Sequence, residues 1–156
     1  MIQPNAAELS MHTAQSDISE EYQLDEQIGY LLRLANQRHL EIFSENMPAL
    51  TPTQFSVLAR LHEVGQLSQN ELGRQVGIDA ATTNGVIDRL YKKGLIKSKT
   101  DSKDKRRLSI SLTAKGVRTT EQAIPVAQEI TRKTVEKLTA AEASKLVKLL
   151  KKIQKT

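Results

Sequence analysis

Positive charge is concentrated in one short segment of this chain. Residues 97–107 contain six lysines and arginines but only two aspartates, a local net charge of +4. Alternating residues at 95–100 and 107–112 predict a β-hairpin around the turn at residues 101–104. Such a tip can contact phosphates or place an arginine in a narrow minor groove, or it can protect an edge hairpin from aggregation. The candidate DNA-contacting residues here are Lys103, Asp104, Lys105, Arg106 and Arg107.

Two short helices are predicted directly before this hairpin, at residues 68–76 and 79–93, with a tight connection at Gly77. A helix-turn-helix has this arrangement, and the N-terminal part of its second helix faces base edges. Small polar side chains suit close approach, since Asn can pair with adenine and Thr can touch a thymine methyl. The same residues can also simply cap and solvate a short helix. The candidates on this helix are Ala81, Thr82, Thr83, Asn84 and Arg89.

Signatures of catalysis are missing from the sequence. The three histidines, His12, His39 and His62, are far apart, and none has a carboxylate at metal-ligand spacing. The seven glycines form no phosphate-binding loop, and the absence of cysteine excludes thiolate metal sites and disulfides. We therefore expect no catalytic residue, no metal site, no cofactor and no enzymatic activity.

The charge balance also points to a polyanionic partner. Residues 1–26 contain six acids and no Lys or Arg, so the remaining chain, with 23 basic and 12 acidic residues, carries +11. A solvated basic surface is the alternative explanation. The chain has neither an apolar run long enough for a membrane span nor the pattern of a signal peptide, so we expect a cytoplasmic protein.

The predicted fold class is mainly α, with a small β-hairpin wing on a helix-turn-helix domain and a helical dimerisation domain. Residues 1–18 are predicted to be a flexible arm, and a long helix is expected from Ser19 to Pro48. Caps at Thr51, Thr113 and Thr139 begin further helices. We assign residues 49–116 to DNA binding, and residues 19–48 and 117–156 to dimerisation. The apolar stripes of these terminal helices would be buried either in an intrachain bundle or in a two-fold homodimer.

Several motifs resemble the MarR family of bacterial transcription regulators. The chain has Asp104-Lys105-Arg106 followed by Leu112-Thr113-Ala114-Lys115-Gly116, and residues 50–55 and 88–95 are also similar to the family. The resemblance spans residues 24–155 and implies a winged-helix homodimer on a pseudo-palindromic operator. It implies that Arg106 enters the minor groove with Asp104 orienting it, although Asp88 is an alternative partner for Arg106. Gly85 departs from the family, where a larger and often basic residue is common.

The resemblance also implies a small aromatic acid as effector, bound between the dimer helices and the winged domain. His39 lies on the apolar stripe of the first helix, where an ionisable side chain is unexpected. It is either a satisfied packing histidine or part of such a pocket, and our candidates are Arg33, Arg38, His39 and His62. The chain also resembles repressors of aromatic and N-heterocyclic acid catabolism, including those that respond to nicotinate-type compounds.

Our main interpretation is a ligand-responsive repressor with double-stranded DNA, a second copy of itself and a small aromatic or heteroaromatic acid as partners. The alternative is a winged-helix interaction module that uses the basic wing on an acidic protein. A small acid–base enzyme has little support.

Overall fold

The computed structural model describes residues 21–154. The chain divides into two compact units, and the boundary in the sequence lies between Gln37 and Arg38. The first unit contains a 3₁₀ helix, η1 (Leu24–Glu26), and the beginning of α2 (Ile28–Asn46). The expected flexible arm and the helix start at Ser19 lie outside the described residues. The long helix begins later than predicted, because Gln23 and Gln27 are extended and the Gln27 side chain donates to the Gln23 carbonyl at 2.8 Å.

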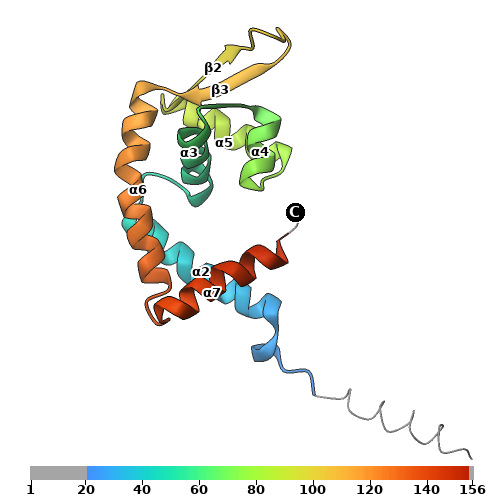
Figure 1. The fold of residues 1–156 in the computed structure, drawn as a ribbon, viewed down its shortest axis with the longest axis vertical. Coiled ribbons are helices and arrows are strands. Elements are labelled where there is room, and N and C mark those ends of the chain that lie inside the picture. The colour runs from blue at the N-terminus through green and yellow to red at the C-terminus, as the bar shows by residue number, and fades with distance from the viewer. Residues whose placement is uncertain (1–20, 155–156) are drawn as a thin grey trace, which may run out of the picture. The chain divides into compact units, whose positions relative to one another are not determined.

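The second unit contains the remaining elements and confirms the predicted fold class, mainly helical with a small antiparallel sheet. Figure 1 shows strands β2 and β3 as a hairpin that projects beyond helices α3, α4 and α5. The elements after α2 are α3 (Pro52–Val64), β1 (Gln66–Ser68), α4 (Gln69–Val76), α5 (Ala80–Lys92), β2 (Ile96–Thr100), β3 (Leu108–Leu112), α6 (Ala114–Thr134) and α7 (Ala140–Ile153).

Polar side chains begin these helices at the positions that the sequence predicts. Thr51, Asp79, Thr113 and Thr139 each accept a hydrogen bond from the backbone N–H three residues further on. Thr51 and Thr139 form complete capping boxes, in which Gln54 and Glu142 accept from the cap residue's own N–H. Each cap satisfies backbone donors that the helix itself leaves unpaired.

The sheet has three strands rather than the predicted two. Its order is β1-β3-β2, so β3 is central and pairs antiparallel with both neighbours. Leu67 of β1 lies opposite Ile110 of β3, whose side chain is buried. The short strand β1 therefore holds the base of the hairpin against the helices.

The core of this unit consists mainly of aliphatic side chains from α3, the helices packed around it and the sheet. The largest fully buried ones are Leu58 and Leu61 on α3, Leu72 on α4, Leu90 on α5 and Ile130 on α6. Burial of these side chains is the main force that fixes α4 and α5 against α3. The same contacts hold the exposed side of α5 in one orientation.

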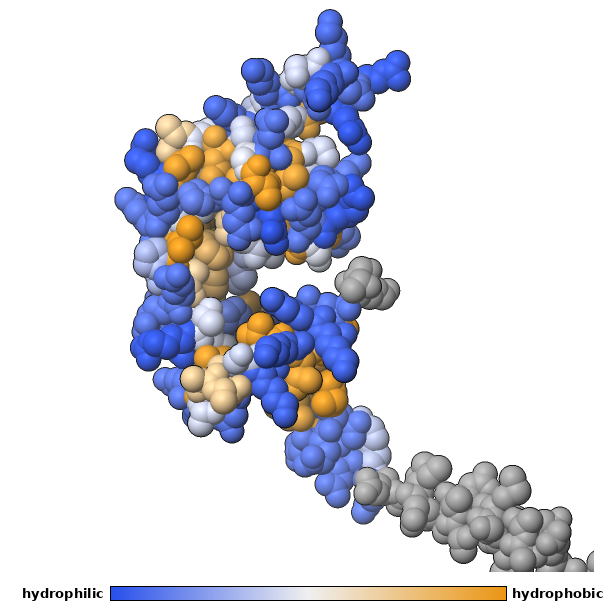
Figure 2. All heavy atoms as spheres, viewed as in Figure 1, coloured by the Kyte–Doolittle hydropathy of each residue, from blue (hydrophilic) through white to orange (hydrophobic). Residues whose placement is uncertain are grey.

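Apolar residues remain exposed on the C-terminal helix. On α7, Val147, Leu149 and Ile153 are 52%, 50% and 65% exposed. In Figure 2, hydrophobic residues (orange) lie at the surface among hydrophilic ones (blue). None of the helices in residues 21–154 has the length and apolar character that crossing a bilayer requires.

Candidate nucleic-acid interface and pocket

The connection between α4 and α5 is tight and locally stabilised. Gly77 ends α4 in the left-handed conformation, with φ of 72°. Asp79 then caps α5, since its Oδ1 accepts from the Thr82 backbone N–H at 2.7 Å and its Oδ2 from the Thr82 hydroxyl at 3.0 Å. The backbone hydrogen bond from Thr82 is the main reason that the pKa of Asp79 lies below its ordinary value. The turn thus fixes where α5 begins.

Gly73 allows α4 and α5 to pack closely. A Cβ atom at this position would lie 2.7 Å from Thr83 Oγ1, which is closer than side chains pack. Thr83 is only 2% exposed, and its hydroxyl donates to the Asp79 carbonyl at 2.7 Å. The structure therefore places Thr83 between the two helices and away from the surface that can meet a base edge.

The other candidate residues on α5 are exposed. They are Ala81, Thr82, Asn84 and Arg89. The Thr82 hydroxyl proton is given to Asp79, which leaves its oxygen lone pairs and its methyl group for a partner. Asn84 Oδ1 accepts a hydrogen bond from Gln69 Nε2 at the start of α4. This contact uses one of the two lone pairs on Asn84 Oδ1, so a two-bond pairing with adenine would use the other lone pair or replace Gln69.

The wing presents cations, and its acids shape the turn. Asp101 Oδ1 accepts from the Lys103 backbone N–H at 2.8 Å, and Asp104 Oδ1 accepts from that of Arg106 at 3.0 Å. No lysine or arginine of residues 97–107 forms a salt bridge with another residue of the described chain. The exposed cationic side chains at the tip are Lys103, Lys105, Arg106 and Arg107. They are available to an external anion.

The two aspartates that the sequence offers as partners of Arg106 have different contacts. Asp104 contacts Arg106 through the backbone N–H and thereby sets the turn on which the arginine stands. Asp88 instead forms a salt bridge with Lys92, one turn along the same helix, at 2.9 Å. The Asp104 contact is thus a way to orient Arg106 without neutralising its guanidinium.

The base of the wing is fixed by the Leu-Thr-x-x-Gly motif. Thr113 Oγ1 donates to the Gly94 carbonyl at 2.6 Å and accepts from the Gly116 N–H at 3.0 Å. A Cβ atom on Gly116 would lie 1.9 Å from the Leu95 carbonyl oxygen, so only glycine fits there. The motif therefore joins the beginning of α6 to the strand that enters the wing.

His39 makes a specific hydrogen bond to α6. Its Nδ1 lies 2.9 Å from Thr134 Oγ1, whose own proton is donated to the Ile130 carbonyl at 2.8 Å. Thr134 must therefore accept, so Nδ1 of His39 carries a hydrogen. When the ring is neutral, the lone pair therefore lies on Nε2, which has no hydrogen-bond partner among residues 21–154. Phe43 lies beside the ring, with centroids 6.2 Å apart.

The other three effector candidates have different surroundings. Arg38 is exposed, and its Nη1 lies 4.0 Å from Oε2 of Glu41. His62 Nε2 lies 3.5 Å from Glu121 Oε1 across α3 and α6. Arg33, which belongs to the first unit, stands over the ring of Tyr30 at 5.4 Å. Among the described residues of the second unit, no hydrogen bond or salt bridge joins any two of Arg38, His39 and His62.

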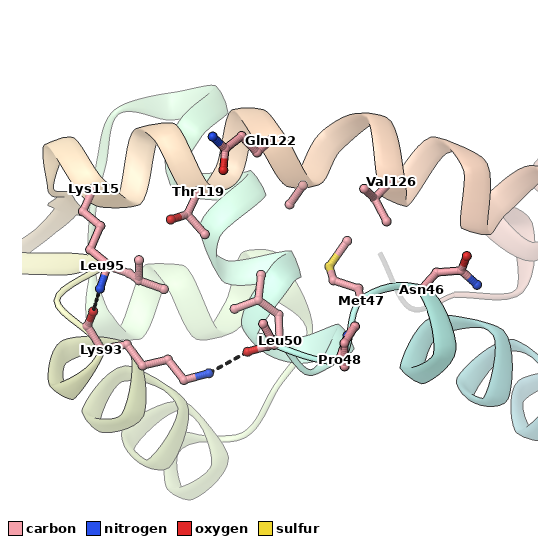
Figure 3. A pocket seen from close by; sticks show the side chains of 12 residues that line it. Asn46, Met47, Pro48, Leu50, Lys93, Leu95, Lys115, Thr119, Gln122 and Val126 are labelled. Atoms are coloured by element: carbon pink, nitrogen blue, oxygen red, sulfur yellow. Dashed lines mark hydrogen bonds between the residues drawn. The ribbon is translucent and has the colours of Figure 1, made fainter.

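A pocket of about 490 Å³ opens in the second unit, and none of the four candidates lines it. Figure 3 shows Met47, Leu50, Leu95 and Val126 facing it, with Lys93 and Lys115 at one side. Lys93 Nζ donates to the Ala49 carbonyl at 2.8 Å, and Lys115 Nζ donates to the Lys93 carbonyl at 2.9 Å. No local sequence pattern predicts this pocket, because its walls come from three separated segments.

Comparison with known proteins agrees with this geometry. The model of the MarR family matches residues 50–108, from the beginning of α3 into β3. The HTH-type transcriptional repressor NicR of Pseudomonas putida is 36% identical over 134 residues, which is 85% of each chain. The predicted class, a transcription regulator and not an enzyme, is the class of these proteins.

Two solved structures are similar over most of their length. BpsR of Bordetella bronchiseptica, whose DNA binding is regulated by 6-hydroxynicotinic acid, has 38% identity and a TM-score of 0.83, covering 86% of this chain and 98% of that chain. A MarR variant of E. coli in complex with operator DNA has 28% identity and a TM-score of 0.77, covering 88% and 100%. The chain belongs to the MarR family of DNA-binding, winged-helix transcription regulators.

Proposed function

We propose that this regulator is a homodimeric repressor that binds a pseudo-palindromic operator and leaves it when a small aromatic or heteroaromatic acid binds. The observation that carries the proposal is the exposed N-terminal part of α5 together with the charges of the wing. The aspartates of the wing accept hydrogen bonds from its own backbone, whereas its lysines and arginines form no salt bridge within the described residues. In this arrangement α5 contacts base edges, while the wing contacts phosphates and the adjacent minor groove.

Dimerisation is supported by the apolar residues that a single protomer leaves in water. Leu146, Leu149 and Ile153 on α7 recur at three- and four-residue spacing, which is the spacing of a helix stripe that packs against a partner. A two-fold interface covers the same stripe on both copies. We assign residues 19–48 and 117–156 to this interface, and residues 49–116 to DNA binding.

The effector class is supported by BpsR, which is similar over nearly its whole length and responds to 6-hydroxynicotinic acid. In this chain, His39 Nε2 can accept from a ring hydroxyl or, when protonated, donate to a carboxylate. Phe43 beside the imidazole provides an aromatic surface for a ring. The dimer can adopt a conformation whose α5 helices are wrongly spaced for the operator. An effector that binds this conformation more tightly than the DNA-binding one shifts the dimer toward it and so releases the DNA.

DNA binding is tested with labelled duplexes from the region beside the protein's own gene. Fluorescence anisotropy should give much tighter binding to one of them than to a duplex of the same composition in scrambled order. Equal affinity for both duplexes would refute the repressor proposal. In that case, tight binding to an acidic protein segment would favour the alternative, an interaction module with a basic wing.

The effector is tested by titrating 6-hydroxynicotinic, nicotinic and benzoic acids into the preformed complex. At least one acid should release the DNA, and His39→Ala should need a higher concentration of it. Lys137→Ala, which removes an exposed charge between α6 and α7, is the control. If His39→Ala responds like the wild type, His39 is a packing residue, and the pocket beside Lys93 and Lys115 becomes the first place to search.

A further inference from the structure

Gly85, in the middle of α5, has an unusual neighbour. The atom that a Cβ on Gly85 would meet is Nη1 of Arg89, at 3.6 Å. The guanidinium of Arg89 therefore extends back along the helix, alongside a residue one turn closer to the N-terminus. Helical side chains lean in this direction, and residues four apart lie on the same face.

The backbone itself does not require glycine at this position. Gly85 has no positive φ, unlike Gly65, Gly77 and Gly94. Glycine also weakens a helix interior relative to alanine. The structural consequence of Gly85 is space: outside its own helix backbone and chain neighbours, the described residues place only the Arg89 guanidinium within 4 Å of a Cβ at this position.

The Arg89 guanidinium is also available for a new contact. Its neighbour Asp88 is paired with Lys92, and Arg89 makes no salt bridge within residues 21–154. Arg89 is exposed, and Thr82, Gly85 and Arg89 lie on the same side of the helix. Arginine has a planar fork of donors that matches the two acceptors on the major-groove edge of guanine.

We propose that Arg89 determines operator specificity by binding a guanine base. Its guanidinium occupies the space beside Gly85, where any other residue would place a side chain. The proposal rests on the proposed operator binding and specifies one of its contacts. It distinguishes Arg89 from the lysines of the wing, which contact phosphates and change affinity for all sequences alike.

The test measures binding to the operator and to a set of duplexes that each differ by one base pair. Arg89→Ala should lose the preference at one position in each half-site, a change on the order of 10- to 100-fold in discrimination. Arg89→Lys should lose the same preference while it keeps the salt dependence, because lysine retains the charge but not the fork.

Gly85 provides the second arm of the test. Gly85→Leu should displace the guanidinium and lose preference at that same position, and the double variant Gly85→Leu/Arg89→Ala should be no worse than Arg89→Ala. Gly85→Ala is the control, because its Cβ makes only an ordinary contact at 3.6 Å, and it should keep the wild-type preference.

Two results would overturn the proposal while operator binding stands. One is a uniform loss of affinity for every duplex in Arg89→Ala, which would make Arg89 a phosphate contact. The other is an unchanged base preference in a folded Gly85→Leu dimer. A wild-type protein without any preference among the duplexes would instead refute the proposed function, and this inference with it.

Discussion

At the level of single residues, the acidic and basic side chains of the wing have different roles: the acids shape the turn, and the cations remain available to an external anion. Asp101 and Asp104 accept hydrogen bonds from backbone N–H groups of the turn, so they determine its shape. The lysines and arginines between and after them make no salt bridge within the described chain. Since shape and charge reside on different side chains, individual cations can be removed without loss of the turn.

The first prediction concerns Arg106 and Lys103. Arg106→Ala should weaken operator binding by about 10-fold or more, and unequally among operators that differ in minor-groove width. Lys103→Ala should weaken binding to all duplexes alike and reduce the slope of log affinity against log salt by about 1. Anisotropy titrations at several salt concentrations measure both effects, with Lys137→Ala as the control. Unchanged binding by a folded Arg106→Ala dimer would contradict the assigned role.

A second prediction at this scale concerns Gly116. Gly116→Ala should destabilise the fold by about 1–3 kcal/mol, because the new Cβ meets the Leu95 carbonyl oxygen at 1.9 Å and the backbone must move. Gly29→Ala is the matched control, since no described residue lies within 4 Å of its Cβ and alanine favours a helix. Urea unfolding gives both free energies. Equal stability of the two variants would show that the close contact is not a constraint.

At the scale of elements, local signals in the sequence predicted most of what the structure shows. The caps at Thr51, Asp79 and Thr113 each act within one helical turn, so the sequence contains both partners of the hydrogen bond. Strand β1 was not predicted, because three residues are too short for an alternating pattern and the strand exists only through pairing with β3. The start of α2 differed because Gln23 and Gln27 are extended and the Gln27 side chain donates to the Gln23 backbone carbonyl.

The parts of the candidate site that lie within one contiguous motif could be predicted from the sequence. The parts that form where distant segments come together could not. The exposed cations of the wing follow from its sequence. The burial of Thr83 depends on Gly73 in the preceding helix, and the engagement of Asn84 depends on Gln69, 15 residues earlier. The pocket beside Lys93 and Lys115 needs three segments to come together. These contacts depend on tertiary packing, which no local pattern encodes.

The prediction at this scale concerns the cap of α5. The pKa of Asp79 is lowered from 3.8 in the folded protein, so its contribution to stability is present above pH 3.8 and is lost as the pH falls through the lowered value. Asp79→Ala should therefore lower the urea midpoint at neutral pH, and its difference from the wild type should shrink in acid.

Asp79→Asn separates the cap from its charge, because asparagine caps helices without titrating in this range. The difference in unfolding free energy between Asp79→Asn and Asp79→Ala should stay constant as the pH falls. The difference between the wild type and Asp79→Ala should shrink. A wild-type advantage over Asp79→Ala that persists unchanged well below the lowered pKa would show that the carboxylate is not the stabilising group.

At the scale of the whole molecule, the exposed stripe of α7 makes a dimer the expected working form. Leu149→Glu places a charge on this stripe and should shift the protein toward monomer in sedimentation velocity at micromolar concentration. Ser144→Glu adds the same charge at another exposed position on α7 and should leave the dimer intact. A wild-type protein that sediments as a monomer with and without DNA would contradict the dimer.

Footprinting of the protein on the DNA beside its own gene tests dimeric, sequence-specific binding directly. A dimer with two exposed α5 helices should protect two related, inverted half-sites whose centres are about one helical turn, roughly 34–36 Å, apart. Adding the effector acid should remove both protected regions together. Protection of a single half-site, or no protection at concentrations that retard DNA of any sequence, would contradict the claim that this protein is a dimeric, sequence-specific regulator.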